Sequence, residues 1–409
     1  MHIAVVFGLL TPGDGCVPLQ NCLESQAHRS QDLGRIRPID DLRSAVIVLV
    51  VAHHAALAYI RHAHVDPEHY IQSSAPVVDP QRWWPLDLLV SWNDHYFMAL
   101  LFLLSGLFVL PSLRRKGIRR FLLERALRLG LPFLVAASLL SPLAFYPSWL
   151  MSAQKDGLPF WQRYYGIDGW SPGPAWFLWL LLAFCLVVAL AYGLAPAWLR
   201  RWSWQPRSSL QLMSVCLACS WIASGAMALV VAPDQWVTLV GPLSVQASRL
   251  LLYAAWFLLG VALGAGNLEE ALAMTMLRPW RQWAMVGALA YLLTVVLQAQ
   301  PGGLAPQPPL SLHLALAFSG AACGTFTILA ALGFARRFLG APGRLAASLR
   351  QNSYGIFLLH YPLVTWTQFA LLAVPLPAAL KFLISFGVAL GGSWLLTIVL
   401  RQTPLGRVI

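Results

Sequence analysis

The sequence predicts an all-α fold, that of a polytopic integral membrane protein with about ten transmembrane helices and both termini in the cytoplasm. Of its 409 residues, 58% are hydrophobic and only 11% are charged, whereas about a quarter of the residues of a soluble domain are charged. The mean hydropathy is +0.64. Apolar runs of membrane length recur along the whole chain, and a soluble core of this size does not need them.

Ten apolar stretches, separated by proline, glycine and clusters of charge, are each long enough to cross a bilayer as a helix. We expect these spans at residues 41–61, 92–113, 128–150, 174–198, 208–232, 246–265, 282–300, 311–334, 353–373 and 377–400. Residues 1–34 are expected to form a cytoplasmic tail, and residues 35–409 the membrane domain. The first ten residues, MHIAVVFGLL, are too short for the core of a signal peptide and lack a basic region before them.

The connections between the stretches differ in charge, and this difference predicts the orientation. Residues 114–128, RRKGIRRFLLERALR, contain seven Lys and Arg residues. In the ten-span topology, 22 of the 28 Lys and Arg residues lie on the same side as this connection and four lie on the other. The positive-inside rule places the basic side, with both termini, in the cytoplasm.

The formal net charge of +12 has the same origin. The basic residues lie between hydrophobic runs, and no basic face interleaved with aromatic residues, of the kind that binds nucleic acid, is present. We therefore expect a lipid bilayer as partner and no nucleic acid.

Several common catalytic and metal-binding motifs are missing from the sequence. Cys216 and Cys219 are spaced like a redox or zinc pair, but no second pair or neighbouring histidines accompany them, so packing is the better interpretation. The sequence contains no H-E-x-x-H, no Walker A motif and no G-x-S-x-G elbow. We expect no metal. The Gly260–Gly264 and Gly320–Gly324 pairs, each spaced G-x-x-x-G, are expected at helix contacts.

The first span contains the most informative polar residues, in the stretch RSAVIVLVVAHH at 43–54. Arg43 and His54 are eleven residues apart, close to three helical turns, so they share a face and lie about 16 Å apart along the axis. This spacing places His54 toward the bilayer centre, whereas His53 points about 100° away. Titratable groups inside a span are costly and are functional candidates by default. The alternative is that Arg43 anchors the helix at the interface and the histidines bond neighbouring helices.

Further polar residues accompany this pair. Asp40 precedes Arg43 by three residues and can cap the helix or pair with the arginine. Arg125 and Arg128 are spaced to share one helical face before the third span. They are suited either to lipid headgroups or to a phosphate-bearing ligand. His360, in NSYGIFLLHYP of the ninth span, is either functional or bonded to a neighbouring helix.

Taken together, the motifs resemble the acyltransferase-3 family of integral membrane acyltransferases. IDDLRSAVIVLVVAHH, FLLSGLF, ERALRLGLP, PAWFLW and NSYGIFLLHYP follow one another in the order seen in that family. Asp40, Arg43 and His54 match the spacing of the family's first-span motif, and His53 does not. Arg125 and Arg128 match its paired arginines. The resemblance covers roughly residues 36–400, and PAWFLW resembles the branch that contains periplasmic glucan succinyltransferases.

This resemblance implies an O-acyltransferase of the cell inner membrane. The acyl group would pass from a cytoplasmic acyl-CoA, with no bound cofactor, to a hydroxyl of a carbohydrate, a lipid-linked acceptor or another acceptor at the membrane or its outer face. His54 would act as catalytic base, a role that suits an imidazole with a reference pKa near 6.5. Arg43 would position the donor or polarise the site. The expected substrate-binding residues are Arg125, Arg128, Asp40, His360 and Trp176.

Two questions stay open at this level. His54 can act as general base in a direct transfer or accept the acyl group itself. The protein can also belong to a different class, a transporter or exporter in which His54, Arg43 and His360 line a substrate or proton path. A transporter typically shows two related halves with paired broken helices, and the sequence shows no such symmetry. A non-catalytic scaffold leaves the alignment of Arg43 with His54 unexplained.

Overall fold

The computed structural model describes residues 37–152, 157–197, 202–303, 305 and 307–407. The tail expected at residues 1–34 lies outside them. Apart from a hairpin of two short antiparallel strands, β1 (Trp236–Thr238) and β2 (Ser244–Gln246), the regular structure in this part of the chain is helical. The prediction of an all-α membrane protein is thereby confirmed.

Within the described residues, nine helices extend over fifteen or more residues each. They are α2 (Arg37–Ala56), α3 (Trp84–Gly106), α9 (Trp176–Leu194), α11 (Ser209–Ala228), α12 (Leu250–Gly264), α15 (Trp280–Gln298), α16 (Leu310–Phe338), α17 (Arg344–Leu371) and α18 (Ala378–Leu400). The short helices are α4 (Val109–Lys116), α8 (Phe160–Gly166), α13 (Leu268–Ala271) and α14 (Met274–Leu277). The 3₁₀ turns are η1 (Leu57–Tyr59), η2 (Tyr70–Gln72), η5 (Gly173–Ala175), η6 (Ala247–Arg249) and η7 (Pro404–Arg407).

The third span is a composite helix over Ile118–Met151. It consists of α5 (Ile118–Arg125), the π-helical turn η3 (Ala126–Gly130), α6 (Leu131–Val135), a second π-helical turn η4 (Ala136–Leu140) and α7 (Ser141–Met151). The span was expected to begin at residue 128 and begins ten residues earlier. The charged first turns remain helical because Glu124 pairs with Lys116 and with Arg120, which offsets their polarity.

Among the described residues, nine helices are long and apolar enough to cross a bilayer, and they cover nine of the ten expected spans. The remaining stretch, 353–373, is helical up to residue 371 and forms the C-terminal part of α17. Its mean hydropathy is lower because it contains polar residues such as His360, Thr365 and Gln368, and these side chains are buried inside the protein. A polar helix is tolerated there because it faces other helices and not lipid.

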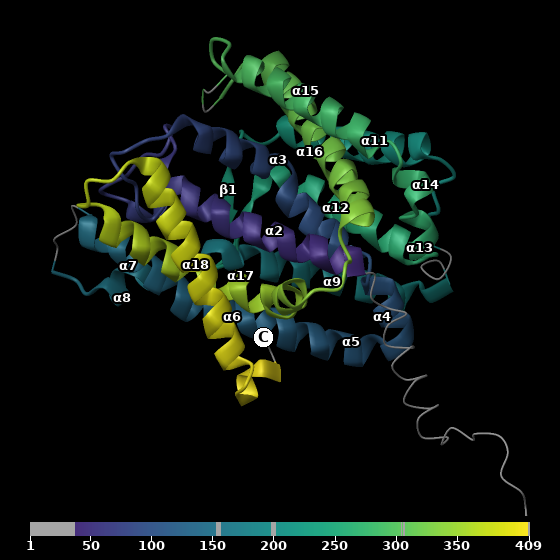
Figure 1. Ribbon diagram of the computed structural model, residues 1–409, viewed down its shortest axis with the longest axis horizontal. Helices are drawn as coiled ribbons and strands as arrows, with labels where there is room; N and C mark the ends of the chain where they lie inside the picture. Colours follow the sequence, from purple (N-terminus) through teal and green to yellow (C-terminus); the bar gives the residue numbers. More distant parts are fainter. Residues whose placement is uncertain (1–36, 153–156, 198–201, 304, 306, 408–409) are drawn as a thin grey trace, which may run out of the picture.

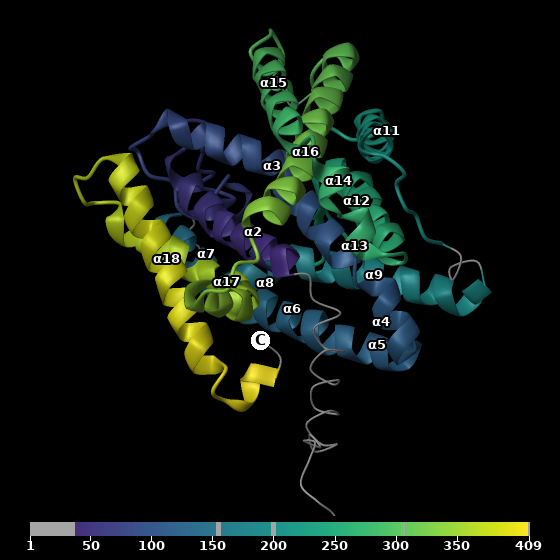
Figure 2. The same cartoon turned by 45° about the vertical axis from the view of Figure 1, so that its right-hand side comes forward.

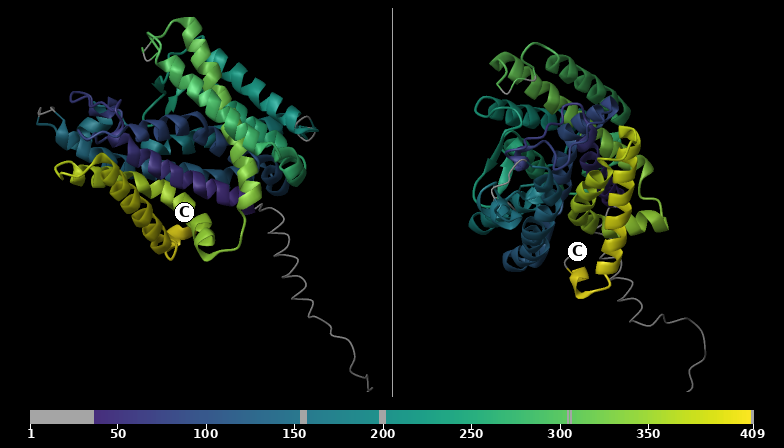
Figure 3. Two further views of the ribbon diagram at one scale, coloured as in Figure 1. Left: turned by 45° about the horizontal axis from the view of Figure 1, so that its top comes forward. Right: turned by 90° about the vertical axis from the view of Figure 1, so that its left-hand side faces the viewer.

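Helix α2 lies at the centre of the molecule and packs against α3, α16, α17 and α18. Figures 1 and 3 show it (purple) between α17 and α18 on one side and α16 on the other. Helices α15 and α16 form a pair that extends beyond α2 and α3, with α11 beside them (Figure 2). Because α2 is central, neighbouring helices surround the polar residues in its last turn.

Close contact between α3 and α12 depends on small residues. A Cβ atom on Gly260 or Gly264 would meet the backbone carbonyl of Leu103 or Leu107. Gly324 of α16 approaches the carbonyl of His95 in the same way. Both glycine pairs therefore lie at helix contacts, as expected.

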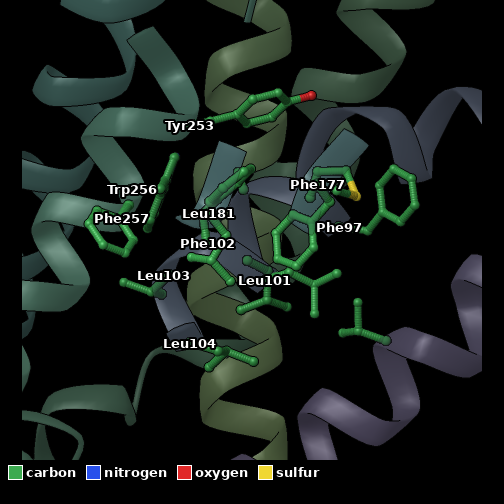
Figure 4. Packing of buried hydrophobic residues seen from close by; sticks show 14 of the residues in the cluster. Phe97, Leu101, Phe102, Leu103, Leu104, Phe177, Leu181, Tyr253, Trp256 and Phe257 are labelled. Carbon is green, nitrogen blue, oxygen red and sulfur yellow. The ribbon is translucent and has the colours of Figure 1, made fainter. Parts of the chain in front are cut away.

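The core next to this contact is aromatic and aliphatic, with side chains from α3, α9 and α12 interleaved (Figure 4). The labelled residues include Phe102 from α3, Phe177 from α9, and Tyr253, Trp256 and Phe257 from α12.

The helix ends group by charge. Near the start of α2, Asp41 accepts hydrogen bonds from the Gly340 backbone N–H and from Arg350, at the end of α16 and the start of α17. Arg114 of α4 donates to the carbonyl of Ala265, which follows α12. The basic connections thus meet at one end of the bundle, which we call the basic face. The end at which α2 finishes is the opposite face.

Candidate active site

The two adjacent histidines lie in the last turn of α2 and face different helices. The His54 ring centroid is 5.0 Å from that of His360 and 5.2 Å from that of Tyr361, both on α17. The His53 ring lies 5.0 Å from Phe97 on α3, and its Nε2 atom is 3.8 Å from Oδ1 of Asp94. This divergence follows from the 100° rotation between neighbouring helical residues.

The position along the helix differs from the expectation for His54. Because α2 begins at Arg37 and ends at Ala56, His54 lies near the end of the helix at the opposite face and not at its middle. The first span was expected to extend to residue 61, but the chain leaves the α-helical conformation after Ala56 and continues as the turn η1.

The hydrogen bonds of His54 determine its tautomer. Its Nδ1 atom is 2.8 Å from the carbonyl oxygen of Val50 and 3.2 Å from Nε2 of His360. A carbonyl oxygen only accepts, so Nδ1 carries the hydrogen and the neutral ring has its lone pair on Nε2. Both contacts engage Nδ1, which leaves Nε2 as the basic atom.

His360 is fully buried and held in one orientation. Its Nδ1 atom lies 2.7 Å from the carbonyl oxygen of Phe357 and therefore carries the hydrogen. Its Nε2 atom is then an acceptor, which shares the hydrogen on Nδ1 of His54 with the closer carbonyl oxygen of Val50. A charge on His54 after proton uptake would be stabilised through this bond, much as a second residue orients the histidine of a catalytic triad.

Gln368 connects α17 to the backbone beside His54. Its Nε2 atom donates to the carbonyl oxygens of His54, at 3.2 Å, and Ala55, at 3.1 Å. The last carbonyls of a helix have no partner within it, and a buried helix end needs such donors. Gln368 therefore holds the end of α2 in place. Neither Gln368 nor Tyr361 was identified from the sequence, since both are ordinary residues of an apolar helix.

A small cavity lies beside Tyr361, between η4, α7, η5 and α17. Its lining includes Ser141, Pro172 and Pro174. Gly173, with a φ of 53°, forms the turn between the two prolines, and a Cβ atom there would lie 3.1 Å from Oγ of Ser141.

Behind this cavity, the Tyr164 hydroxyl donates to the Ser171 carbonyl over 2.6 Å. Burial raises the pKa of Tyr164 well above its usual value, so the phenol stays protonated and remains a donor.

The expected donor-side residues lie nearer the basic face. Nη1 of Arg43 is 3.5 Å from Oδ1 of Asp40, and its guanidinium lies over the ring of Phe108, 5.7 Å from the centroid. Asp40 is in the first turn of α2, so of the two expected roles it pairs with the arginine. Arg43 is about three turns from His54 along α2.

Arg125 and Arg128 lie on the basic side of the third span. Arg125 ends α5, with its guanidinium 5.1 Å from the centroid of Phe121. Arg128 is exposed and belongs to the π-helical turn η3. The α-helical i, i+3 spacing expected to place Arg125 and Arg128 on one face does not apply in a π-helical turn. The carbonyl of Arg128 accepts a hydrogen bond from Tyr354 of α17.

Trp176 does not lie against His54. Its ring packs 5.6 Å from Trp236 of the β-hairpin and 5.6 Å from Tyr253 of α12. Among the expected site residues, the structure thus brings together His54 with His360 and Arg43 with Asp40. The contacts of Arg125, Arg128 and Trp176 are with other residues.

Two charged residues near His53, namely Asp94 and Arg249, were not assigned a role from the sequence. Arg249, in the turn η6, donates to the backbone carbonyl of Asp94 and lies 3.5 Å from Oδ1 of Asp234. Asp94 in turn faces His53. An arginine inside or next to an apolar span was the available signal. Within the described part of the chain, no group of three or more His, Cys, Asp or Glu side chains is placed to hold a metal ion.

Comparison with known families identifies the chain. Residues 37–398 match the model of the acyltransferase-3 family, described as an acyltransferase domain. The chain belongs to this family. Among curated proteins and among solved structures, no match was found. The protein is accordingly a multi-pass membrane acyltransferase that acts on groups other than aminoacyl groups, and the helices that carry its histidines lie inside the matched region.

Proposed function

We propose that this acyltransferase moves an acyl group from a cytoplasmic acyl-CoA to a hydroxyl of a carbohydrate or other acceptor at the outer side of the cell inner membrane. The observation that carries the proposal is the His54–His360 pair. With Nδ1 of His54 held by Val50 and His360, the Nε2 lone pair is oriented and available to take a proton.

In the proposed reaction, Nε2 of His54 removes the proton of the acceptor hydroxyl as its oxygen attacks the thioester carbonyl carbon. The carbon–sulfur bond breaks, and the CoA thiolate takes the proton from the imidazolium. An acyl-histidine route uses the same Nε2 atom as nucleophile, so both mechanisms depend on one tautomer.

The proposed donor path begins at the basic face. Arg125 and Arg128 would bind the CoA phosphates there, because guanidinium groups suit phosphate oxygens. Arg43, paired with Asp40, would contact the donor farther along α2, on the face that it shares with His54. An elongated donor that extends from the phosphates to His54 fits this order of residues along the helices.

His360 has a different proposed role from substrate binding. Its ring is fully buried and bonded through both nitrogens to protein groups, so we assign it as a positioning residue that acts through His54. For Trp176, the packing against Trp236 and Tyr253 favours a supporting role for the wall of the site.

A transfer assay tests the proposal. Purified protein in lipid nanodiscs is incubated with radiolabelled acetyl-CoA or succinyl-CoA and with envelope carbohydrate extracted from cells that lack the protein. We expect labelled carbohydrate, and a loss of about 10²–10⁴-fold in rate for His54→Ala, the usual contribution of a positioned base. His53→Ala is the matched control and should stay within tenfold of wild type.

Full transfer by His54→Ala would exclude His54 as the reactive base, and a selective loss in His53→Ala would transfer the role to its neighbour. Label that stays on the protein in the absence of carbohydrate, and is lost in His54→Ala, would favour the acyl-histidine route. The absence of transfer from either thioester would contradict the proposed donor.

A further inference from the structure

A second cavity lies between α3, α11, α12, α15 and α16, and the proposed chemistry does not yet use it. It has a volume of about 1150 Å³, including the part open to solvent. Its lining includes Pro233 and Gly303, which belong to the two connections at the opposite face. The cavity therefore lies toward the face at which α2 ends, the same end of the bundle as His53 and His54.

The polar groups of its lining are of several kinds. Arg249, Asp234, His95, His313, Ser248 and Gln298 all face the cavity. They offer a cation, an anion, imidazoles, a hydroxyl and an amide, so they can both donate and accept hydrogen bonds. Because the arginine and the aspartate balance one another, the lining does not select strongly for a charged ligand. Such mixed groups suit a neutral ligand with many hydroxyls better than an acyl chain.

One polar atom of this lining lacks a partner. The Oγ atom of Ser248 is buried and makes no hydrogen bond to any described residue. A buried hydroxyl without a partner is uncommon, and this one belongs to a residue that lines the cavity. The neighbouring Arg249 is fixed by the Asp94 carbonyl and by Asp234, so the guanidinium is held in place before any ligand enters.

Asp94 connects the cavity to the histidines. Its backbone carbonyl accepts from Arg249, and its partly exposed carboxylate lies 3.8 Å from Nε2 of His53. His53 also has a buried Nδ1 atom without a hydrogen-bond partner among the described residues. Asp94 thus lies between Arg249 of the cavity lining and the imidazole of His53, the residue before His54 in α2.

We propose that this cavity binds the carbohydrate acceptor of the proposed reaction, and that the bound unit carries no net charge. The inference rests on the proposed function and adds the location and the charge of the second substrate. In this arrangement the acceptor approaches α2 from the α3 side, where His53 lies, whereas the donor runs along the helix from the basic face.

A large side chain placed in the cavity tests, through steady-state kinetics, whether the acceptor binds there. Ser224 of α11 lines the cavity, whereas Ile222, two residues earlier, is 73% exposed on the outside of the same helix. With the envelope carbohydrate as acceptor, we expect Ser224→Trp to raise the KM for carbohydrate at least tenfold and that for acetyl-CoA less than twofold. The matched control Ile222→Trp should behave as wild type. An unchanged carbohydrate KM in a folded Ser224→Trp variant overturns the location.

A labelling experiment tests the same cavity without relying on transfer. The Ser224→Cys variant is treated with a water-soluble maleimide. The control is Val65→Cys, at an exposed position of the connection after α2. The parent chain gives the background labelling of its own cysteines. Envelope carbohydrate should slow labelling of Ser224→Cys at least threefold and leave Val65→Cys unaffected. The proposal is overturned if carbohydrate does not slow the labelling of Ser224→Cys. It is also overturned if phosphatidylglycerol vesicles slow this labelling and carbohydrate does not. If carbohydrate slows the labelling but no acyl transfer occurs, the assignment of the cavity as the carbohydrate site is supported and the assignment of acyl-CoA as donor is wrong.

Discussion

The Nε2 atom of His360 lies 3.2 Å from Nδ1 of His54, although the two residues are 306 positions apart in the chain. This contact joins the first span of the acyltransferase to α17 and, with the Val50 carbonyl, fixes the hydrogen of His54 on Nδ1. A base that is oriented in this way needs no rearrangement before it takes up a proton at Nε2.

Replacing His360 tests its positioning role. We expect His360→Ala to lower kcat by roughly 10–100-fold, about 1.4–2.7 kcal/mol of transition-state stabilisation, with little change in the KM for acyl-CoA. His360→Gln should recover part of the rate, because an amide oxygen can accept the hydrogen of His54. Steady-state kinetics of both variants in nanodiscs measure the difference. A rise in KM alone would instead identify His360 as a substrate-binding residue.

Reversing the charge of Arg125 and Arg128 tests the donor site. The Arg125→Glu/Arg128→Glu variant should raise the KM for acyl-CoA about tenfold or more, since each tenfold corresponds to about 1.4 kcal/mol. Arg119→Glu, at an exposed position of the same α5 helix, is the control and should leave this KM near wild type. If both variants only reduce the amount of protein in the membrane, the arginines act as headgroup anchors.

A buried ion pair holds the connection after α2 against α18. Nζ of Lys381 lies 2.6 Å from Oδ2 of Asp79, and both side chains are 1% exposed. Lys381→Met should destabilise the protein by about 3–5 kcal/mol, because it leaves the Asp79 carboxylate buried without its partner. Thermal unfolding in detergent measures the loss. The double variant Asp79→Asn/Lys381→Met should be more stable than Lys381→Met; equal losses would mean that the charge of Asp79 is not the cause.

The contact between α3 and α12 should be sensitive to a single side chain. Gly264→Val places its side chain against the backbone carbonyl of Leu107, which cannot move aside, so we expect a loss of about 1–3 kcal/mol or more. Gly391→Val of α18 is the control, since a Cβ atom there meets nothing within 4 Å. Melting temperatures of the two variants provide the comparison, and similar values would contradict the close helix contact.

Much of the helical architecture could be predicted because hydropathy is a local property. The helix boundaries were less predictable where a charged residue near the end of a helix is paired with an opposite charge. Helix α3 begins at Trp84 and not near residue 92, partly because Asp87 is paired with Arg61 across 3.0 Å. A count of charges along the sequence cannot recognise such a pair, since the partner lies in another segment.

The candidate site divides in the same way. The helical period alone places Arg43 and His54 on one face of α2 and turns His53 away from His54, because these relationships depend on residues eleven positions apart or fewer. Only the tertiary structure decided that His54 bonds to His360, that Gln368 holds the end of α2, and that Arg249 meets Asp94 beside a polar cavity. Those contacts join helices that are distant in sequence, and packing between helices, which no local pattern encodes, selects which faces meet.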